Sequence, residues 1–342
     1  MSSVTIIEIP TKPQQSQPSV RCRSTKSFFS HVGQSPDLQW FTPKWFTLSM
    51  GTGVLASTVS QLPHHSFRTL GLVLFYTNVA LLSLLIIFQM LQLCIHPGVV
   101  TQSKDLVYYG AVPLAMSTVV WDGPLGYVLW VVAVAMAWMA MLMFVYLASR
   151  QFDFTVSWLF LIAPLAACAS AGSTIQDYPT VTMSYILLGA GAPLTFIILV
   201  LHVQTLVAHP QAYNPQLNIM PLGPVGQIGV AAISLGHNKQ SKERAQLGLM
   251  VWGCCCFWAI HGFCSITSIM LQGGKRKWPG WALVFPIGVF TTLTIELGEV
   301  LGEDFFRFTG IGLVAVLFCL WLVNIGCAMA DAWTGAISSF PS

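Results

Sequence analysis

Hydroxyl side chains recur in short runs along the chain, each a few residues after a break in an apolar segment. The runs lie at 57–58, 117–118, 170–174 and 291–294. A further segment carries Gly223, Gly226 and Gly229 instead, with the amide of Gln227 among them. Hydroxyl and amide groups donate hydrogen bonds without carrying charge, and helix ends add a positive dipole, so such a set suits a small anion that is bound weakly and released. The alternative is that these residues only pack helices together.

Two other groups of residues are of types that bind metal ions or haem, but their arrangement does not favour such a site. Cys254, Cys255 and Cys256 are consecutive, and on a helix they point in directions about 100° apart, so they cannot converge on one metal ion. Only His202 and His261 lie well inside apolar segments, which is too few for the paired axial ligands of a transmembrane haem protein. We therefore expect no metal, no cofactor and no catalytic residues.

Composition determines the class of protein that these residues belong to. The chain has 342 residues, of which 55% are hydrophobic and only 8% charged. A soluble domain carries about 25% charged residues. This excludes a soluble enzyme, a nucleic-acid-binding protein and a disordered scaffold, because so few charges cannot cover a soluble surface. The sequence is that of an integral membrane protein in contact with a lipid bilayer.

Long stretches without Asp, Glu, Lys or Arg predict the membrane spans, since a bilayer needs about 20 apolar residues. One example is the stretch between Lys44 and Arg68, and the longest, between Asp177 and Lys239, has room for two spans. We predict an all-α membrane protein with ten transmembrane helices, at about 45–62, 67–95, 106–122, 124–149, 154–176, 181–208, 218–236, 245–272, 280–298 and 304–333.

The predicted helices alternate between broken and continuous ones. Four of the five odd-numbered helices contain a proline between apolar residues, as at Pro113, Pro164 and Pro286, whereas the even-numbered helices are longer and contain one proline away from their ends, Pro193. Broken backbone is tolerated at membrane depth where protein packs it or where it lines a wet cavity. We therefore predict five hairpins around a central pore with quasi-fivefold symmetry, the short helices inside. The alternative is that proline and glycine are simply common in membrane helices.

Candidate pore-lining residues follow from the breaks and from a narrow polar stripe in the first helix, where Ser49 and Thr52 share a face. The candidates are Ser49, Thr52, Pro113, Ser117, Thr118, Pro164, Ser170, Gly223, Gln227, Pro286 and Thr291. No Lys or Arg lies inside a predicted span, so we expect transport to be channel-like or weakly coupled. Glu296 and Glu299, near the end of the ninth helix, are expected at the outer mouth.

The polar ends of the chain set the predicted topology. Residues 1–43 are rich in Pro, Gln and Ser and are expected to form a disordered cytoplasmic tail, followed by a transporter domain at 44–335 and a short cytoplasmic C-terminus at 336–342. With the N-terminus inside, the cytoplasmic side carries the larger number of Lys and Arg residues, although the loop from Lys239 to Arg244 violates this rule. Both termini should face the cytoplasm.

Several motifs resemble the tellurite-resistance/dicarboxylate transporter family, over about residues 40–335. The segment 41–53, which opens the first helix, carries the family resemblance, and segments 184–189, 221–227 and 285–291 are most similar to its fungal sulfite efflux pump branch. The resemblance implies a plasma-membrane transporter of small anions, most similar to a sulfite exporter, and not an enzyme. A malate or other C4-dicarboxylate permease is the alternative within the family. A membrane-embedded enzyme would need a histidine pair or an acid/base pair that the sequence does not offer.

The family also implies a homotrimer of independent pores, each blocked by a phenylalanine of the ninth helix. Phe285 and Phe290 both flank Pro286 and stand about 140° apart on a helix, so only one of them can face the pore. Either ring could instead be a packing or lipid-facing aromatic. Of the two, we expect Phe285 to be the gate because it adjoins the break.

Overall fold

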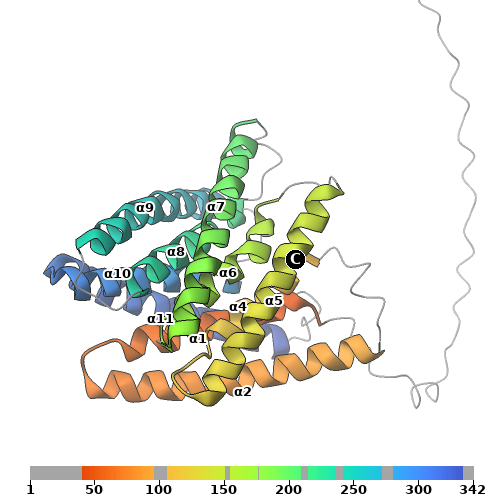
Figure 1. The fold of residues 1–342 in the computed structure, drawn as a ribbon, viewed down its shortest axis with the longest axis horizontal. Coiled ribbons are helices and arrows are strands. Elements are labelled where there is room, and N and C mark those ends of the chain that lie inside the picture. The colour runs from red at the N-terminus through yellow and green to blue at the C-terminus, as the bar shows by residue number, and fades with distance from the viewer. Residues whose placement is uncertain are drawn as a thin grey trace, which may run out of the picture. The chain divides into compact units, whose positions relative to one another are not determined.

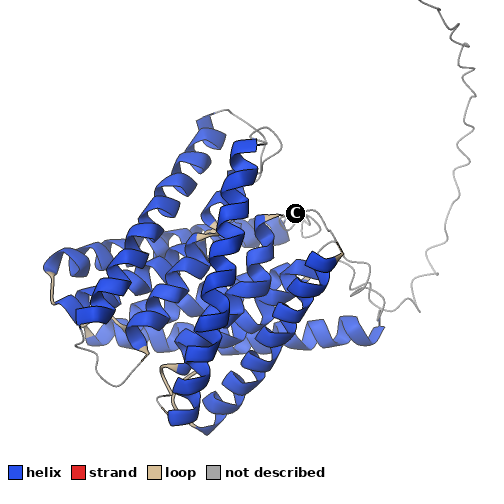
Figure 2. Cartoon of the chain, turned by 45° about the horizontal axis from the view of Figure 1, so that its top comes forward, coloured by secondary structure: helices blue, strands red, loops and turns tan. Residues whose placement is uncertain are grey.

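The computed structural model of the protein describes residues 41–95, 106–150, 155–175, 177–208, 215–235, 242–271 and 280–333. These residues fold into helices and contain no β-strand (Figure 2). The predicted all-α class is therefore confirmed for this part of the chain. Of the predicted terminal segments, 336–342 and all but the last three residues of 1–43 lie outside the described residues.

Long and short helices alternate along the described chain. The long helices are α2 (His65–Ile95), α5 (Pro124–Ser149), α7 (Tyr178–Ala208), α9 (Lys242–Leu271) and α11 (Asp304–Trp333). The short helices are α1 (Phe46–Ser60), α4 (Ala111–Ser117), α6 (Leu159–Gly172), α8 (Leu222–Ser234) and α10 (Val284–Leu301). A 3₁₀ turn precedes each short helix, at η3 (Pro43–Trp45), η4 (Leu106–Gly110), η5 (Val156–Trp158), η6 (Pro215–Ile219) and η7 (Gly280–Ala282).

Length and hydropathy make this a multi-pass membrane protein. Seven helices are long and apolar enough to cross a bilayer, namely the five long helices, α10, and α8 with the turn before it. Burial separates the two kinds of helix. In the best apolar window, 83% of the residues around α8 and 72% of those in α10 are buried, compared with 17% to 33% in the long helices. The exposed side chains of the long helices are mainly apolar, which suits contact with lipid.

Each short helix packs against two other short helices. The contacting pairs are α1 with α4, α4 with α6, α6 with α8, α8 with α10, and α10 with α1. Each long helix also packs against the short helix that precedes it in the chain. In Figure 1, α2, α5 and α9 lie at the edges of the view, and α4, α6 and α8 lie between them.

The broken backbone of α6 is packed by protein. Pro164 has no N–H, so the carbonyl of Phe160 lacks its helical donor. Gly110 of η4 packs directly against this carbonyl, and a Cβ at Gly110 would collide with its oxygen. The close approach requires glycine and shields the freed carbonyl from lipid, as a break at membrane depth needs.

Hydrogen bonds tie every long helix to the short helix of the next pair. The donors and acceptors are Asn78 Nδ2 to Thr118 Oγ1 (3.1 Å), Trp130 Nε1 to the Cys168 carbonyl (2.8 Å), Tyr185 Oη to the Leu235 carbonyl (3.2 Å), Trp252 Nε1 to Thr294 Oγ1 (3.0 Å) and Trp321 Nε1 to Thr52 Oγ1 (3.1 Å). The last bond runs from α11 back to α1, so the series closes on itself. These bonds fix the rotation of the short helices relative to one another.

Candidate functional site

A cavity of about 330 Å³ lies among the short helices, and all five of them contribute to its lining. Most of its polar lining residues carry hydroxyl groups. The polar lining residues are Ser57, Gln61, Ser117, Thr118, Ser170, Ser173, Thr174, Gln227, Ser234, Thr292, Glu296 and Glu299. We call this space the polar cavity.

A second, apolar cavity of about 30 Å³ lies among the same helices. Its lining residues precede those of the polar cavity by about one helical turn: Met50 precedes Gly53, Leu114 precedes Ser117, and Pro286 precedes Val289. Because the order is the same on each short helix, the short helices run in the same direction. The two cavities therefore lie in succession along them, about 5 Å apart in helical rise.

The polar cavity lies at the C-terminal ends of the short helices. Gln61, Thr118 and Ser173 are the C-cap residues of α1, α4 and α6, and Ser234 is the last residue of α8. A helix C-terminus carries a partial negative charge. The negative ends of these helices therefore face the cavity. The expectation from the sequence, that positive helix ends face the anion, is wrong for this cavity.

Most lining hydroxyls direct their protons to backbone carbonyls. Thr118 Oγ1 donates to the Ala115 carbonyl at 2.7 Å and Thr292 Oγ1 to the Gly288 carbonyl at 3.1 Å. Ser117, Ser173 and Thr174 donate in the same way to carbonyls three residues earlier. A hydroxyl whose proton is used in this way offers the cavity only an acceptor.

Four neutral polar side chains of the lining keep their hydrogen-bond donors available to the cavity. Among the described residues, the side chains of Ser57, Gln61, Ser170 and Gln227 make no hydrogen bond to protein. Gln227 lies on α8, Ser170 on α6, and the other two at the end of α1. These side chains are the neutral hydrogen-bond donors that the polar cavity can offer to a solute.

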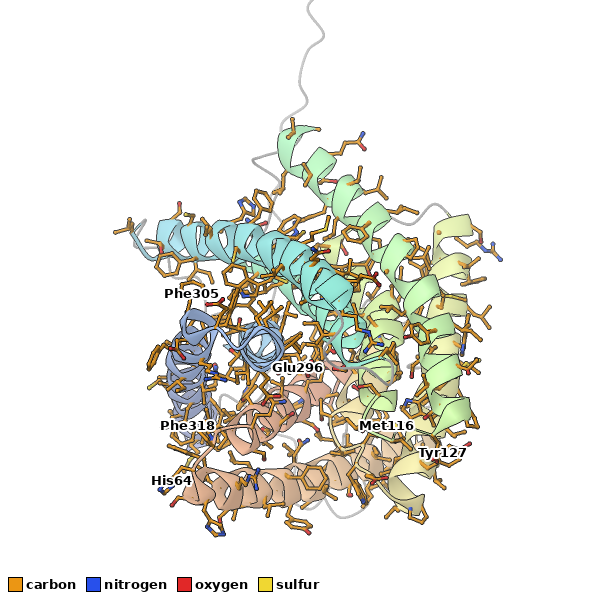
Figure 3. The ribbon with its side chains drawn as sticks, turned by 60° about the vertical axis from the view of Figure 1, so that its left-hand side comes forward. His64, Met116, Tyr127, Glu296, Phe305 and Phe318 are labelled. Atoms are coloured by element: carbon orange, nitrogen blue, oxygen red, sulfur yellow. The ribbon has the colours of Figure 1, made fainter. Side chains whose placement is uncertain are left out.

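The charged side chains among the described lining residues are two carboxylates. Glu296 accepts a hydrogen bond from Ser234 Oγ at 2.8 Å, and Glu299 follows one turn later on α10. None of the described lining residues is Lys, Arg or His. In Figure 3, Glu296 lies toward the middle of the helices, whereas Phe305 and Phe318 of α11 lie at their edge.

The two phenylalanines of α10 point in different directions. Phe285 lines the apolar cavity, and a Cβ at Gly223 of α8 would lie 3.4 Å from its ring. Phe290 instead stacks on Trp252 of α9, with ring centroids 5.9 Å apart and planes inclined by 27°. The same Trp252 binds Thr294. Phe290 therefore packs against an outer helix, while Phe285 faces the space between the short helices.

The residues singled out from the sequence divide into three sets. Ser117, Thr118, Ser170 and Gln227 line the polar cavity, and Gly223, Phe285 and Pro286 line the apolar one. Ser49, Thr52, Pro113, Pro164, Phe290 and Thr291 line neither cavity. Of these, Ser49 donates to Asn78 Oδ1 at 2.8 Å, Thr52 to the Leu48 carbonyl and Thr291 to the Ile287 carbonyl. Gln61 and Ser234 were not singled out, and their position at the polar end of a short helix is the signal that could have identified them.

The cysteines and histidines of the described residues do not line either cavity. Cys254, Cys255 and Cys256 lie on α9, and His202 stacks on Trp258 between α7 and α9. Within the described ranges, no group of three or more His, Cys, Asp or Glu side chains is placed to hold a metal ion.

Known proteins and a family model match most of the length of this chain. A model described as voltage-dependent anion channel matches residues 40–329. A sulfite efflux pump of Arthroderma benhamiae is 26% identical over 337 residues, covering 83% of this chain and 88% of that protein. A sulfite efflux pump of Trichophyton rubrum shows the same identity and coverage. An uncharacterised transporter of Methanocaldococcus jannaschii is 26% identical over 335 residues, covering 87% of this chain and 96% of that protein.

Proposed function

The chain belongs to the voltage-dependent anion channel family, as its sequence motifs indicated, and from this premise we propose that it exports sulfite across the plasma membrane. The proposed path runs between the five short helices, through the apolar cavity and then the polar one. Five hairpins, each made of a short and a long helix, surround this path with quasi-fivefold symmetry. Three such chains form a homotrimer of independent pores.

The observation that carries the proposal is that both cavities are lined from all of the short helices, in the same order along each. A packing defect would be lined by whichever helices happened to adjoin it. The closed series of contacts from α1 through α4, α6, α8 and α10 back to α1 supports a path along their common axis. The succession of hydrogen bonds from long to short helices supports the same repeat.

Phe285 is the proposed gate. Its ring borders the apolar cavity, whose volume of about 30 Å³ is small compared with the volume of about 330 Å³ of the polar cavity. We therefore place the closure of the path at this ring. Phe290 is held away from this space by its stacking on Trp252, which favours Phe285 over Phe290.

Gln227, Ser57 and Ser170 are the proposed anion contacts in the polar cavity, because their side chains are available as donors. They replace part of the hydration shell that the anion loses. With both termini in the cytoplasm, the short helices run outward and the polar cavity opens toward the outside. Residues 1–43 and 336–342 then form the cytoplasmic tails, and the long helices face the bilayer.

Anion flux into proteoliposomes tests the proposal. Purified protein is reconstituted, and the uptake of sulfite, malate, nitrate and chloride is compared at a fixed membrane potential, with protein-free vesicles as the control. We expect sulfite to move fastest. Malate moving fastest would favour a dicarboxylate permease, and no uptake of any anion above that of empty vesicles would refute the transport function.

A further inference from the structure

We infer that Asn78 of α2 is a positioning residue that sets the size limit for solutes on the path between the short helices. This role rests on the proposed anion path. Asn78 acts from outside the lining, by holding α1 and α4 together where their residues form the walls of both cavities. We call Asn78 and its two hydrogen-bond partners, Ser49 and Thr118, the Asn78 clasp.

The first support is that the Asn78 amide bonds two short helices at once. Its Oδ1 accepts a hydrogen bond from Ser49 Oγ of α1 at 2.8 Å, and its Nδ2 donates to Thr118 Oγ1 at the end of α4 at 3.1 Å. In the same series, each of the other four long helices bonds a single short helix. Asn78 is fully buried, although α2 mostly faces lipid. Burying an amide is costly unless its groups are bonded, so the two bonds hold both helices in place.

The second support is the place of the clasp along the path. Ser49 is followed by Met50, which lines the apolar cavity, and Thr118 follows Leu114 of the same cavity by one helical turn. Thr118 itself lines the polar cavity, as does Gly53, one turn after Ser49 on α1. The clasp therefore lies at the seam between α1 and α4, where the apolar cavity is followed by the polar one.

The clasp itself fills the space between these two helices. Gly53 faces the seam, and a Cβ there would lie 2.5 Å from Asn78 Nδ2 and would collide with Thr118 Oγ1. On the other side, α4 has seven residues, which are apolar except for Ser117, and Ser117 donates to the Leu114 carbonyl of its own helix. Among the described residues, the bond from Asn78 to Thr118 is thus the side-chain link from this end of α4 to another helix. Breaking the clasp lets the end of α4 move away from α1 and widens both cavities.

The test uses two anions that differ in size but not in charge. Methanesulfonate has the sulfur and the three oxygens of hydrogen sulfite and carries a methyl group in addition. The uptake of both, and of nitrate, is measured in proteoliposomes at a pH below the second ionisation of sulfite, with protein-free vesicles as the control. The parent protein should carry hydrogen sulfite faster than methanesulfonate. Because no residue of the clasp is charged, a change in the ratio of the two fluxes reports on size.

Two variants break the clasp at different points. Ser49→Ala removes the bond to α1 at a residue that lines neither cavity, and Asn78→Leu removes both bonds with a side chain of similar size. Each should raise the ratio of methanesulfonate to hydrogen sulfite flux by roughly twofold to tenfold, the factor by which one net hydrogen bond shifts an equilibrium. The double variant should raise the ratio no further than Asn78→Leu alone, because both changes open the same clasp.

Thr58→Val and Gln89→Leu are the matched controls. Thr58 is a buried residue of α1 whose hydroxyl donates to the Leu55 carbonyl at 3.0 Å, and Gln89 is a buried residue of α2 whose amide donates to Gln92 of the same helix at 3.3 Å. Neither bond joins two helices, and neither residue lines a cavity. Both controls should keep the parental flux ratio. A ratio raised equally in the controls would show that any lost buried hydrogen bond has this effect, and it would overturn the inference.

The outcomes separate this inference from the proposed function. An unchanged ratio in Ser49→Ala and Asn78→Leu, with sulfite flux retained, would overturn the inference and leave sulfite export standing. A ratio raised in Asn78→Leu alone would also overturn it, because the clasp would then not reach α1. A parent protein that carries nitrate but no sulfite would refute sulfite export, and the ratio of methanesulfonate to nitrate flux would then test the clasp. Loss of all flux in Ser49→Ala, with an unchanged elution profile in detergent, would show that the bond is needed for transport itself and would overturn the inference as well.

Discussion

Replacing Gln227 by leucine tests whether the polar cavity binds anions through its free donors. The amide of Gln227 lies on the cavity wall and makes no hydrogen bond to protein. Leucine has a similar size and no donor, so the packing of α8 should be kept. A hydrogen bond to a charged group contributes about 1.5–3 kcal/mol. We therefore expect sulfite flux at limiting concentration to fall by about tenfold to a hundredfold.

The assay is the dependence of sulfite uptake on sulfite concentration in proteoliposomes that contain equal amounts of folded protein. Thr291→Val is the matched control, since the Thr291 hydroxyl donates to the Ile287 carbonyl at 2.8 Å and lines neither cavity. The control should keep parental flux. If Gln227→Leu also keeps parental flux, the amide is not an anion contact and the assignment of free donors is wrong.

Three further changes test the packing that positions the path. Trp321→Phe removes the N–H that donates to Thr52, and it should lower the stability of the detergent-solubilised protein by about 1 kcal/mol, measured by thermal unfolding. The control Trp138→Phe, on the outer helix α5, should not lower the stability. Equal effects of the two changes would contradict a specific role for the hydrogen bond. Gly53→Ala places a Cβ in collision with the side chains of Thr118 and Asn78, and it should reduce the yield of monodisperse protein. The control Gly189→Ala places its Cβ in open space and should not reduce the yield. A normal yield of Gly53→Ala would mean that α1, α2 and α4 are packed less closely than in this structure. Phe290→Ala should cost about 3–5 kcal/mol of stability by leaving a hole beside Trp252, and an unchanged melting temperature would show that the stacking contributes little.

The sequence predicted the helices well because their signals are local. Charge-free stretches follow directly from the bilayer, and proline removes one backbone hydrogen bond wherever it occurs inside a helix. The predicted span at 304–333 has the same bounds as α11, and the span at 67–95 begins two residues after the start of α2 and ends with it. The alternation of short and long helices also follows from composition, since the short, buried helices carry most of the prolines, although α7 contains Pro193.

The orientation of individual side chains could not be predicted in the same way. Thr52 and Thr118 both carry hydroxyls after a break, yet Thr118 lines the polar cavity and Thr52 accepts a hydrogen bond from Trp321, which lies 269 residues away in the chain. The sequence contains no local signal for such a partner. The state of a hydroxyl proton is equally hidden, because a helical Ser or Thr reaches its own backbone carbonyl whether or not it faces a cavity.

The roles of Phe285 and Phe290 show the same limit. Their spacing predicted that only one ring faces the path, which follows from helix geometry alone. The choice between them depends on Trp252, because Phe290 stacks on its indole ring whereas Phe285 lies beside Gly223. That contact joins α9 to α10 and has no counterpart in the local sequence.

Anion current through Phe285→Ala most directly tests the central claim that a path between the short helices is closed by this ring. The measurement compares sulfite current in cells expressing the parent protein, Phe285→Ala and Phe290→Ala at matched surface levels. Truncating a plug removes a barrier made of bulk alone, so Phe285→Ala should carry a larger current than the parent protein, and Phe290→Ala should not. A current through Phe285→Ala that does not exceed that of the parent protein would contradict the account.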